Sequence, residues 1–352
     1  MNKDIKLLYG NCRSLIGKID ELKILISELK KVEQSPAIMS LVETWLNESK
    51  TNEEVSIPGY MIVSRKDRED TERGRGGGIL IYARDDINAY EENFQALNEF
   101  NQATSVKIKM KEESLNIITV YRSPNTDEQN NDKLNDLLQS CDMNICLVGD
   151  FNFPDINWER SECTQASSRK FLESALENDL KQKVTFNTRG KNILDLVLVQ
   201  DEELVDKVVD LGPLSNSDHS MMSIAVKLQC TKRDKTIQRV PNYSRANYRE
   251  IKKQISERNW EHDLKFMNAN QSWNHFKNTI RHLISENVPT VLRRSINSPV
   301  WSDKMSKIAV RKKHKWWKKY RCGKVTFDDY KNKEKVAKKT IKRAKKNFEN
   351  RL

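Results

Sequence analysis

The first 228 residues alternate short apolar segments with turns, and this pattern predicts many strands and few helices. Strands are expected at residues 6–10, 37–42, 61–64, 78–82, 104–110, 115–121, 144–148, 193–199 and 221–228. Residues 14–30 have helical spacing of their leucines and isoleucines, and residues 168–180 follow a Ser-Ser pair that could cap a helix. Many strands with few helices favour an α/β (α+β) protein in which helices flank packed sheets.

The pattern changes after residue 228. Residues 229–246 contain charged and Pro-Asn-Tyr-Ser stretches typical of a linker, and the rest of the chain is expected to be helical. Three apolar stripes occur there: Trp273, Phe276, Ile280, Leu283 and Ile284; Met305, Ile308, Ala309, Trp316 and Tyr320; and Tyr330, Ala337, Ile341, Ala344 and Phe348. The predicted domains are therefore residues 1–228, a linker at 229–246 and a helical extension at 247–352.

Charge divides the chain in the same place. Residues 231–352 contain 34 Lys and Arg against 11 Asp and Glu, whereas residues 1–230 contain 28 against 39. A cationic segment of this density favours polyanions through counterion release. The alternative is a solvated, lysine-rich helical surface that keeps the protein soluble. Trp316 and Trp317, beside a run of basic residues, could stack on bases or pack between helices.

Neither a membrane nor an oxidising compartment is indicated. The chain begins in a strand-like pattern without an apolar signal core, and no apolar stretch is long enough to span a bilayer. The six cysteines are scattered, with no CxxC pair, and are expected to be reduced. We expect an intracellular soluble protein, nuclear or cytoplasmic, whose oligomeric state the sequence leaves open.

Acidic and amide residues recur where the predicted strands end. Glu43 follows one strand directly, Asp150 and Asn152 follow another, Asp195 interrupts an apolar run, and Asp218-His219 precede the last strand. A carboxylate at the end of a buried strand loses hydration unless a cation or hydrogen bonds compensate. Several such residues suggest a shared metal and phosphate site, because Mg²⁺ prefers a few carboxylate oxygens together with water and phosphate.

In chain order, these residues resemble the motif series of the endonuclease/exonuclease/phosphatase superfamily. The matching positions are Asn11, Glu43-Thr44-Trp45, Tyr121-Arg122, Gly149-Asp150-Phe151-Asn152, Asp195 and Ser217-Asp218-His219. Residues 11–15, 43–46, 76–78 and 121–124 are most similar to the apurinic-endonuclease-like endonucleases of non-LTR retrotransposons. The resemblance covers residues 5 to about 228. It implies a four-layer αββα sandwich of two mixed sheets.

The resemblance also implies a reaction and a role for each residue. The reaction is Mg²⁺- or Mn²⁺-dependent hydrolysis of a DNA phosphodiester that leaves a 3′-hydroxyl. Preorganised donors and a cation at the developing charge suit this chemistry. The implied metal ligands are Glu43, Asn11 and Asp218; the implied catalytic residues are Asp150, Asn152, His219, Asp195 and Tyr121; Thr185, Ser217 and Arg122 would contact the substrate.

Other interpretations stay open. His219 alone could be a structural histidine, Asp150 and Asn152 a simple turn, and Tyr121 a core residue. Within the superfamily, an abasic-site repair nuclease or another phosphoesterase is the alternative, and outside enzymes it is a non-catalytic nucleic-acid-binding remnant. Residues 240–352 resemble the connector to a reverse transcriptase, although no polymerase motif follows. The expected partner is DNA, with RNA as a second candidate ligand of the extension.

Overall fold

The computed structural model describes residues 5–67, 76–109, 114–141, 145–227, 239–292 and 299–351. The ends of three predicted strands, at residues 110, 144 and 228, and most of the predicted linker, residues 229–238, lie outside the described residues. The chain forms two compact units: Met1–Arg233 together with Ile296–Leu352, and Asp234–Ser295. These units divide the chain differently from the predicted boundaries, because the last helices belong with the first unit.

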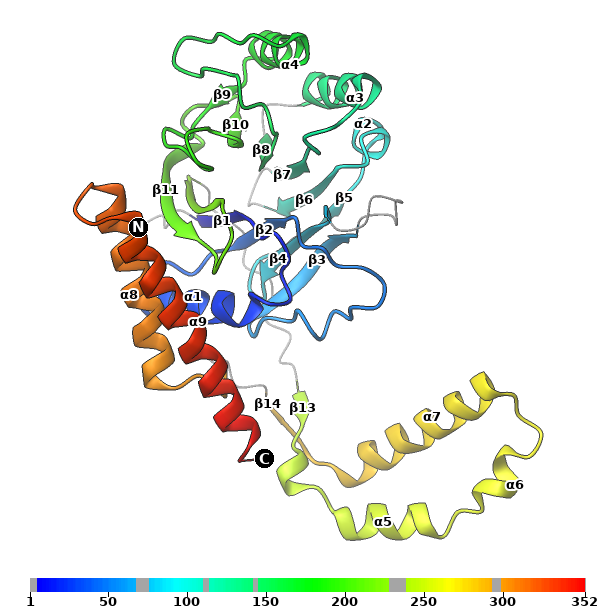
Figure 1. The fold of residues 1–352 in the computed structure, drawn as a ribbon. Coiled ribbons are helices and arrows are strands. Elements are labelled where there is room, and N and C mark those ends of the chain that lie inside the picture. Colours follow the sequence, from blue (N-terminus) through cyan, green and yellow to red (C-terminus); the bar gives the residue numbers. More distant parts are fainter. Residues whose placement is uncertain are drawn as a thin grey trace. The chain divides into compact units, whose positions relative to one another are not determined.

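The first sheet of this unit has six strands in the order β11-β12-β1-β2-β4-β3 (Figure 1). Its strands are β1 (Ile5–Asn11), β2 (Ile38–Val42), β3 (Tyr60–Lys66), β4 (Ile79–Arg84), β11 (Val205–Pro213) and β12 (Ser220–Val226). β1 and β2 run parallel, with Asn11 beside Val42 at their ends. The other neighbouring strands are antiparallel.

The second sheet repeats this plan in the order β5-β6-β7-β8-β10-β9. Its strands are β5 (Ala89–Glu92), β6 (Ala103–Lys109), β7 (Ser114–Tyr121), β8 (Ile145–Asp150), β9 (Lys181–Gln182) and β10 (Asp195–Val199). β7 and β8 are its parallel pair, and they approach so closely that a Cβ on Gly149 would lie 2.2 Å from the Val120 carbonyl oxygen. Only glycine fits this position without a shift of the backbone.

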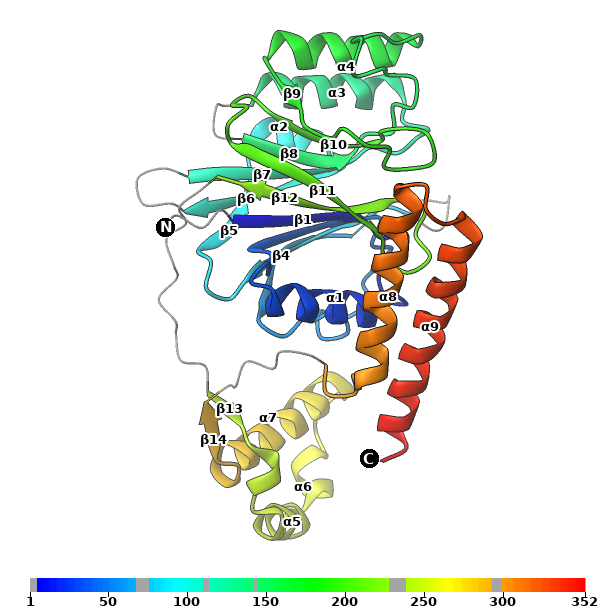
Figure 2. The ribbon, with the colours of Figure 1, turned by 90° about the vertical axis from the view of Figure 1, so that its left-hand side faces the viewer.

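The two sheets pack face to face, and helices cover both outer faces (Figure 2). Apolar side chains from both sheets fill the space between them, including Leu7, Val42, Ile117, Val148 and Val197. Helix α1 (Ile19–Lys31) covers the first sheet, and α2 (Gln95–Glu99), α3 (Glu128–Gln139) and α4 (Ala166–Glu177) cover the second. The predicted four-layer mixed α/β sandwich is confirmed.

Local differences from the predicted elements have local causes. The helix expected at residues 14–30 begins at Ile19, because Arg13 and Ser14 have positive φ values of 41° and 76°. The expected Ser-Ser cap of α4 is wrong: Gln165 precedes the helix without a side-chain cap, and Ser168 instead donates to Asp155 at 2.5 Å. Strand β11 and helix α3 were not predicted, since charged and amide residues interrupt their apolar pattern.

Helices α8 (Lys304–Arg321) and α9 (Phe327–Glu349) form a hairpin that packs on α1 and β11 (Figures 1 and 2). Thr326 caps α9 as its sequence indicates, in a reciprocal bond with Asp329. The third predicted stripe is confirmed, with Tyr330, Ala337, Ile341 and Ala344 buried. Of the second stripe, Ala309 is buried, whereas Met305 is exposed. The buried residues of α8 are Ser306, Ala309, Val310, Lys313 and Trp317, so the buried face contains Trp317 in place of the predicted Trp316.

The tryptophan pair divides into two roles. Trp317 is buried, stacks edge-on against Tyr330 and donates from its indole nitrogen to Asp210 at 3.1 Å. Trp316 is partly buried, with the Lys333 ammonium 4.8 Å from its ring centre. Trp317 is therefore a packing residue that attaches the hairpin to β11.

The second unit contains β13 (Arg239–Pro241), β14 (Thr290–Leu292), α5 (Tyr248–Ser256), α6 (Trp260–Leu264) and α7 (Ala269–Asn287). β13 and β14 pair antiparallel, and α5 packs against α7. Of the first predicted stripe, Leu283 is buried whereas Trp273 is exposed. Within the described part of the chain, none of the helices is both long and apolar enough to cross a bilayer.

We expect Gly212→Ala to destabilise the first unit by about 2–5 kcal/mol. Gly212 has a φ of 81°, and an added Cβ would lie 2.7 Å from the Trp317 ring. Gly323→Ala is the matched control, because Gly323 also has a positive φ of 67° but nothing lies within 4 Å of its Cβ position. That control should cost only about 1–2 kcal/mol. Urea unfolding measures both, and equal losses would mean that the Trp317 contact is not made in solution.

Candidate active site

The polar residues predicted at strand ends meet at one end of the sandwich. β1, β2, β7 and β8 all end there, which places Asn11, Glu43, Tyr121 and Asp150 along one edge. β10 is antiparallel to β8 and begins there, with Asp195 beside Asp150. The parallel pairs β1/β2 and β7/β8 therefore end, and β10 begins, at the same end of the sandwich.

Hydrogen bonds across the two sheets connect these residues. Asn11 of the first sheet donates from Nδ2 to Asp150 Oδ2 of the second at 2.8 Å. The Tyr9 hydroxyl donates to Asp195 Oδ1 at 2.8 Å. His219, which precedes β12, has Nδ1 2.7 Å from Asp195 Oδ2 and Nε2 3.8 Å from Asp150 Oδ2. The buried imidazole thus lies between two buried carboxylates.

Burial and mutual charge determine how this cluster titrates. Burial raises the pKa of Asp150 above its ordinary value, and Asp195 raises it further. Burial by itself would lower the pKa of His219, but Asp195, Asp150 and Asp218 together raise it to about 9. The cluster therefore favours a charged imidazole beside Asp195 at neutral pH.

Both carboxylate oxygens of Asp195 are engaged by hydrogen bonds inside the protein. Its two oxygens accept from Tyr9 and bond to His219, and its backbone N–H donates to Thr188 Oγ1 at 3.0 Å. Asp150, Asp195 and His219 together have the spacing of a metal-binding group. Because Asp195 holds Tyr9 and His219 and, unlike Asp150, does not line the cleft beside the cluster, we interpret it as the residue that orients the imidazole, and not as a metal ligand.

Glu43 lies in a turn with an unusual backbone conformation, and hydrogen bonds hold its carboxylate. Glu43 and Trp45 both have a φ of 54°, in the left-handed region that few non-glycine residues adopt. The Trp45 indole nitrogen donates to Glu43 Oε2, and the Gly77 N–H lies 3.4 Å from Oε1. Strained backbone of this kind persists where the surrounding structure holds it, which is common at functional sites.

A cleft of about 1040 Å³ opens over this cluster. Asn11, Glu43, Tyr121, Asp150, Asn152 and His219 all line it, as do Arg13 and Arg189. Two carboxylates and an amide oxygen facing one cleft are the hard oxygen donors that Mg²⁺ and Mn²⁺ accept. The residues present therefore fit a hydrated divalent cation bound by Glu43 and Asp150 near Asn11.

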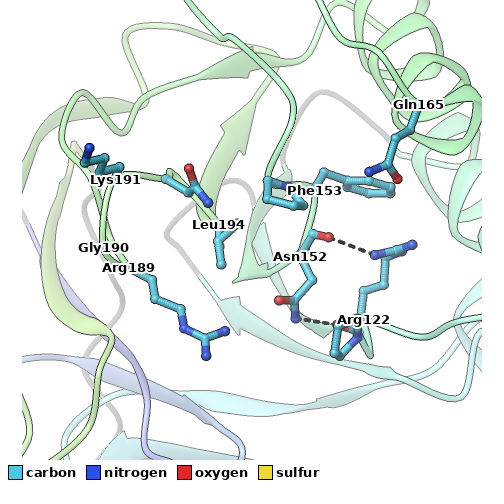
Figure 3. Close-up of a pocket in the computed structure, with 11 residues that line it drawn as sticks. Arg122, Asn152, Phe153, Gln165, Arg189, Gly190, Lys191 and Leu194 are labelled. Carbon is cyan, nitrogen blue, oxygen red and sulfur yellow. Dashed lines mark hydrogen bonds between the residues drawn. The ribbon is translucent and has the colours of Figure 1, made fainter.

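A second cavity of about 470 Å³ adjoins the cleft (Figure 3). Arg122 and Asn152 lie on one side of it, with Arg189, Gly190 and Lys191 on the other. Asn152 donates from Nδ2 to the Arg122 carbonyl oxygen at 2.8 Å, and Arg122 Nη1 donates to the Asn152 carbonyl oxygen at 3.0 Å. These bonds hold the turn after β8 against the turn after β7.

Arg122 has a different environment from the substrate contact that was expected. Its side chain is buried, its Nε donates to Asn131 Oδ1 at 2.7 Å, and its guanidinium stacks 4.0 Å from the centre of the Phe153 ring. Burial lowers the pKa of Arg122 to about 10, and Asp150 partly offsets this effect. Its contacts are those of a residue that positions Asn152.

Three further predicted residues lie outside the cluster or serve it indirectly. Asp218 is half-exposed and pairs with Arg13 at 2.9 Å and with Arg189 at 2.8 Å, so its carboxylate is engaged by two cations. Ser217 is buried and donates to the Asn11 carbonyl oxygen at 2.8 Å. Thr185 is exposed and does not line the cleft.

Sequence reasoning missed several residues of the site. Thr188, three positions after Thr185, bonds the backbone of Asp195. Tyr9 bonds its carboxylate from the interior of a strand, where the sequence shows only an apolar position. Trp45 was noted only as part of a motif, although its indole holds Glu43. A polar atom at the tip of an otherwise apolar side chain was the available signal for Tyr9 and Trp45.

Comparison with known proteins gives a family match over part of the chain and solved structures of similar fold. Residues 115–223 match the model of a family described as endonuclease-reverse transcriptase. The solved structure of an apurinic endonuclease from Leishmania major is 12% identical, with a TM-score of 0.51, and the match covers 64% of this chain and 88% of that one. A search of curated proteins gives no match.

Two further solved structures are similar at lower scores. The endonuclease domain of TRAS1, a telomere-specific non-LTR retrotransposon, is 16% identical over 64% of this chain and 99% of that one, with a TM-score of 0.48. The catalytic domain of human Nocturnin is 18% identical over 64% and 94%, with a TM-score of 0.43.

We expect Asp195→Asn to move the pKa of His219 from about 9 toward the ordinary value of about 6.5. Because the folded-state pKa exceeds that of the unfolded chain, the charged imidazole stabilises the fold below pH of about 6.5. This contribution is lost as the pH rises through about 9. NMR titration of His219 in chelator measures the shift. Asp218→Asn is the control and should lower the pKa less; an unchanged titration in Asp195→Asn would exclude the contact.

Proposed function

We propose that this chain, a member of the endonuclease/exonuclease/phosphatase superfamily, is a divalent-metal-dependent endonuclease that nicks DNA and leaves a 3′-hydroxyl. The observation that supports this most directly is the cross-sheet cluster of Asn11, Asp150, Asp195 and His219 under one cleft. Such a cluster would set a carboxylate and an imidazole beside a single phosphate bound in the cleft.

Glu43 and Asp150 would hold Mg²⁺ or Mn²⁺, with Asn11 beside them. When bound, the cation supplies a positive charge that polarises the phosphate and stabilises the leaving oxygen. Glu43 is kept in place by Trp45 and by its left-handed backbone, so it faces the cleft before any ligand arrives. The pKa of Asp150, raised by burial, falls when a cation lies close, which favours its charged form in the working site.

Side chains of the protein would activate the water and contact the phosphate. Asp150, which accepts from Asn11 and from the Asn152 backbone, would orient the attacking water and draw its proton. His219 would donate from Nε2 to a phosphate oxygen as negative charge develops, because Asp195 keeps its Nδ1 side bonded. Tyr121 lines the cleft and would bond another phosphate oxygen.

Arg13 and Arg189 would add cationic contacts at the rim of the cleft. Each lines the cleft and each is bonded to Asp218, which keeps both guanidinium groups in place while they stay half-exposed. We therefore propose that Asp218 positions two phosphate-binding arginines. This role replaces the one as a metal ligand that the resemblance implied.

We expect the purified protein to convert supercoiled plasmid to open circles with Mg²⁺ or Mn²⁺, and to be silenced by excess chelator. His219→Ala and Asp150→Asn should each lower kcat by at least about 10²-fold. Asp195→Asn should have a smaller effect, since it acts by orienting His219. Quantified nicking of plasmid at saturating DNA measures these effects.

The control for charge is Asp132→Asn, which removes an exposed carboxylate of α3 and should leave kcat unchanged. The nicks should be extended by a DNA polymerase without end treatment, as a 3′-hydroxyl requires. Equal nicking in excess chelator would rule out the metal mechanism, and full activity of Asp150→Asn would remove that residue from the reaction.

The hairpin of α8 and α9 is the proposed source of DNA affinity. Residues 304–351 contain 20 Lys and Arg against four Asp and Glu, and most of these side chains are exposed. The hairpin packs against α1, which follows the loop after Asn11, and Lys345 of α9 pairs with Asp20 in the first turn of α1 at 3.0 Å. We propose that the functional unit includes this hairpin, so that its cations extend the phosphate-binding surface of the cleft.

We expect Lys338→Gln/Lys339→Gln/Lys342→Gln to weaken DNA binding and to flatten its salt dependence. Three lost phosphate contacts would reduce the log–log slope by up to about 2.7, at about 0.9 for each contact. Titrations of a labelled duplex at several salt concentrations measure the slope. The matched control, Lys252→Gln/Lys253→Gln/Lys265→Gln, removes the same charge from exposed residues of the second unit. Equal slopes for the two variants would refute a specific role of α9.

A further inference from the structure

Helix α8 carries a lysine that is buried inside the first unit. The side chain of Lys313 is fully buried, and its Nζ donates to the Pro213 carbonyl oxygen at 2.7 Å and to Glu21 Oε1. Glu21 lies in the first turn of α1. One ammonium therefore joins three segments that are far apart in the chain: the start of α1, the end of β11 and the middle of α8.

Glu21 extends this contact to the turn after β11. The same Oε1 accepts from the Ser215 N–H at 3.2 Å. Ser215 has a φ of 51°, and the turn is closed by a bond from the Ser217 N–H to the Leu214 carbonyl oxygen at 3.0 Å. Lys313 and Glu21 thus hold the entry to this turn and its left-handed residue.

The turn leads directly to the proposed catalytic histidine. The Ser217 hydroxyl donates to the Asn11 carbonyl oxygen at 2.8 Å. The same hydroxyl accepts from the His219 N–H at 3.4 Å. Asn11 in turn bonds Asp150, and His219 bonds Asp195. A displacement of the turn would therefore move both Asn11 and His219 relative to the second sheet.

Helix α8 also contacts the segment that holds Asp195. Arg321 donates to the Asn187 carbonyl oxygen at 3.3 Å, and the next residue, Thr188, bonds the backbone of Asp195. The Thr188 carbonyl oxygen accepts from the Ser220 N–H at 2.9 Å, directly after His219. Helix α8 thus contacts both segments that hold the His219–Asp195 pair: Arg321 bonds the residue before Thr188, and Lys313 bonds Glu21, which holds the turn before His219.

Packing alone does not require this ion pair. The same helices meet through an apolar cluster of Ile24, Val310 and Ile341, which already attaches α8 and α9 to α1. A buried ion pair is often no more stabilising than apolar residues of the same size, but its hydrogen bonds demand one geometry. The pair of Lys313 and Glu21 therefore adds an alignment that the apolar contacts do not specify.

We infer that Lys313 and Glu21 are positioning residues for His219: the docked α8 sets the turn from Leu214 to Ser217 and so aligns the imidazole with Asp150 and Asp195. The C-terminal hairpin is then part of the catalytic apparatus and not only a basic attachment. The inference rests on the proposed nuclease function for its kinetic readout, whereas its structural readout is independent of activity.

The test uses the full chain with Glu21→Met/Lys313→Met, which replaces both charges by apolar side chains of similar length. The matched control is Glu128→Gln/Lys170→Met, which removes an exposed ion pair between two other helices, α3 and α4, outside the hairpin. Hydrogen–deuterium exchange of residues 211–220 reports the turn, and plasmid nicking reports kcat and KM. We expect exchange at Ser215 and Ser217 to accelerate at least about 10-fold, and kcat to fall about 10- to 100-fold with KM little changed.

The control should match the wild type in both measurements. Unchanged exchange in the test variant would overturn the inference whether or not the wild type nicks DNA. An inactive wild type, with accelerated exchange in the test variant, would refute the proposed function alone. Accelerated exchange with unchanged kcat would also overturn it, because the turn would not then govern His219. Should the test variant unfold, Glu21→Gln/Lys313→Met keeps an acceptor for the Ser215 N–H. We expect a smaller loss of kcat in the same direction, and no loss in that folded variant would contradict the inference.

Discussion

The structure depends on hydrogen bonds that cross between the two sheets at one end of an otherwise apolar sandwich. Asn11 bonds Asp150, and Tyr9 and His219 both bond Asp195, with every partner buried. Burying two carboxylates is costly unless donors or a cation compensate. This end therefore forms only when the first sheet brings its donors against the carboxylates of the second. The remaining deficit, visible as the raised pKa of Asp150, is what a divalent cation would satisfy.

The surrounding backbone is arranged to keep these groups in place. Glu43, Trp45, Asn152 and Ser215 all have left-handed φ values, which cost energy in non-glycine residues. Each is held by a bond with another segment: Glu43 and Trp45 with Gly77, Asn152 with the Arg122 carbonyl oxygen, and Ser215 with Glu21. The site is therefore shaped before a substrate arrives, which is the condition for electrostatic stabilisation of a transition state.

The C-terminal hairpin has two faces with different physical roles. Its buried face, with Lys313 and Trp317, is specific and contacts β11 and the turn before His219. Its exposed face is densely cationic, which suits attraction to a polyanion at longer range. Because both faces belong to the same two helices, removing residues after 230 would take away more than charge: it would uncover Ile24 and remove the partner of Glu21, Lys313.

The apolar pattern of the sequence by itself predicted the long strands and an α/β (α+β) class, whereas the four layers were implied by the resemblance. The strand ends identified Asn11, Glu43, Asp150, Asp195 and His219 as candidates, because hydrophobic periodicity and chain order can be read locally. The acidic front and basic back were also plain in the composition.

Only the tertiary structure decided which groups meet. Asp218 forms ion pairs with two arginines, and Thr188, not Thr185, accepts a hydrogen bond from the Asp195 backbone. Lys313 pairs with Glu21, 292 positions away in the chain. The tertiary structure also placed the last two helices with the sandwich instead of with a separate extension. The physical reason is that a charged residue in a polar run has the same sequence signature whether it faces water or a buried partner. The choice depends on which surface the folded chain brings against it.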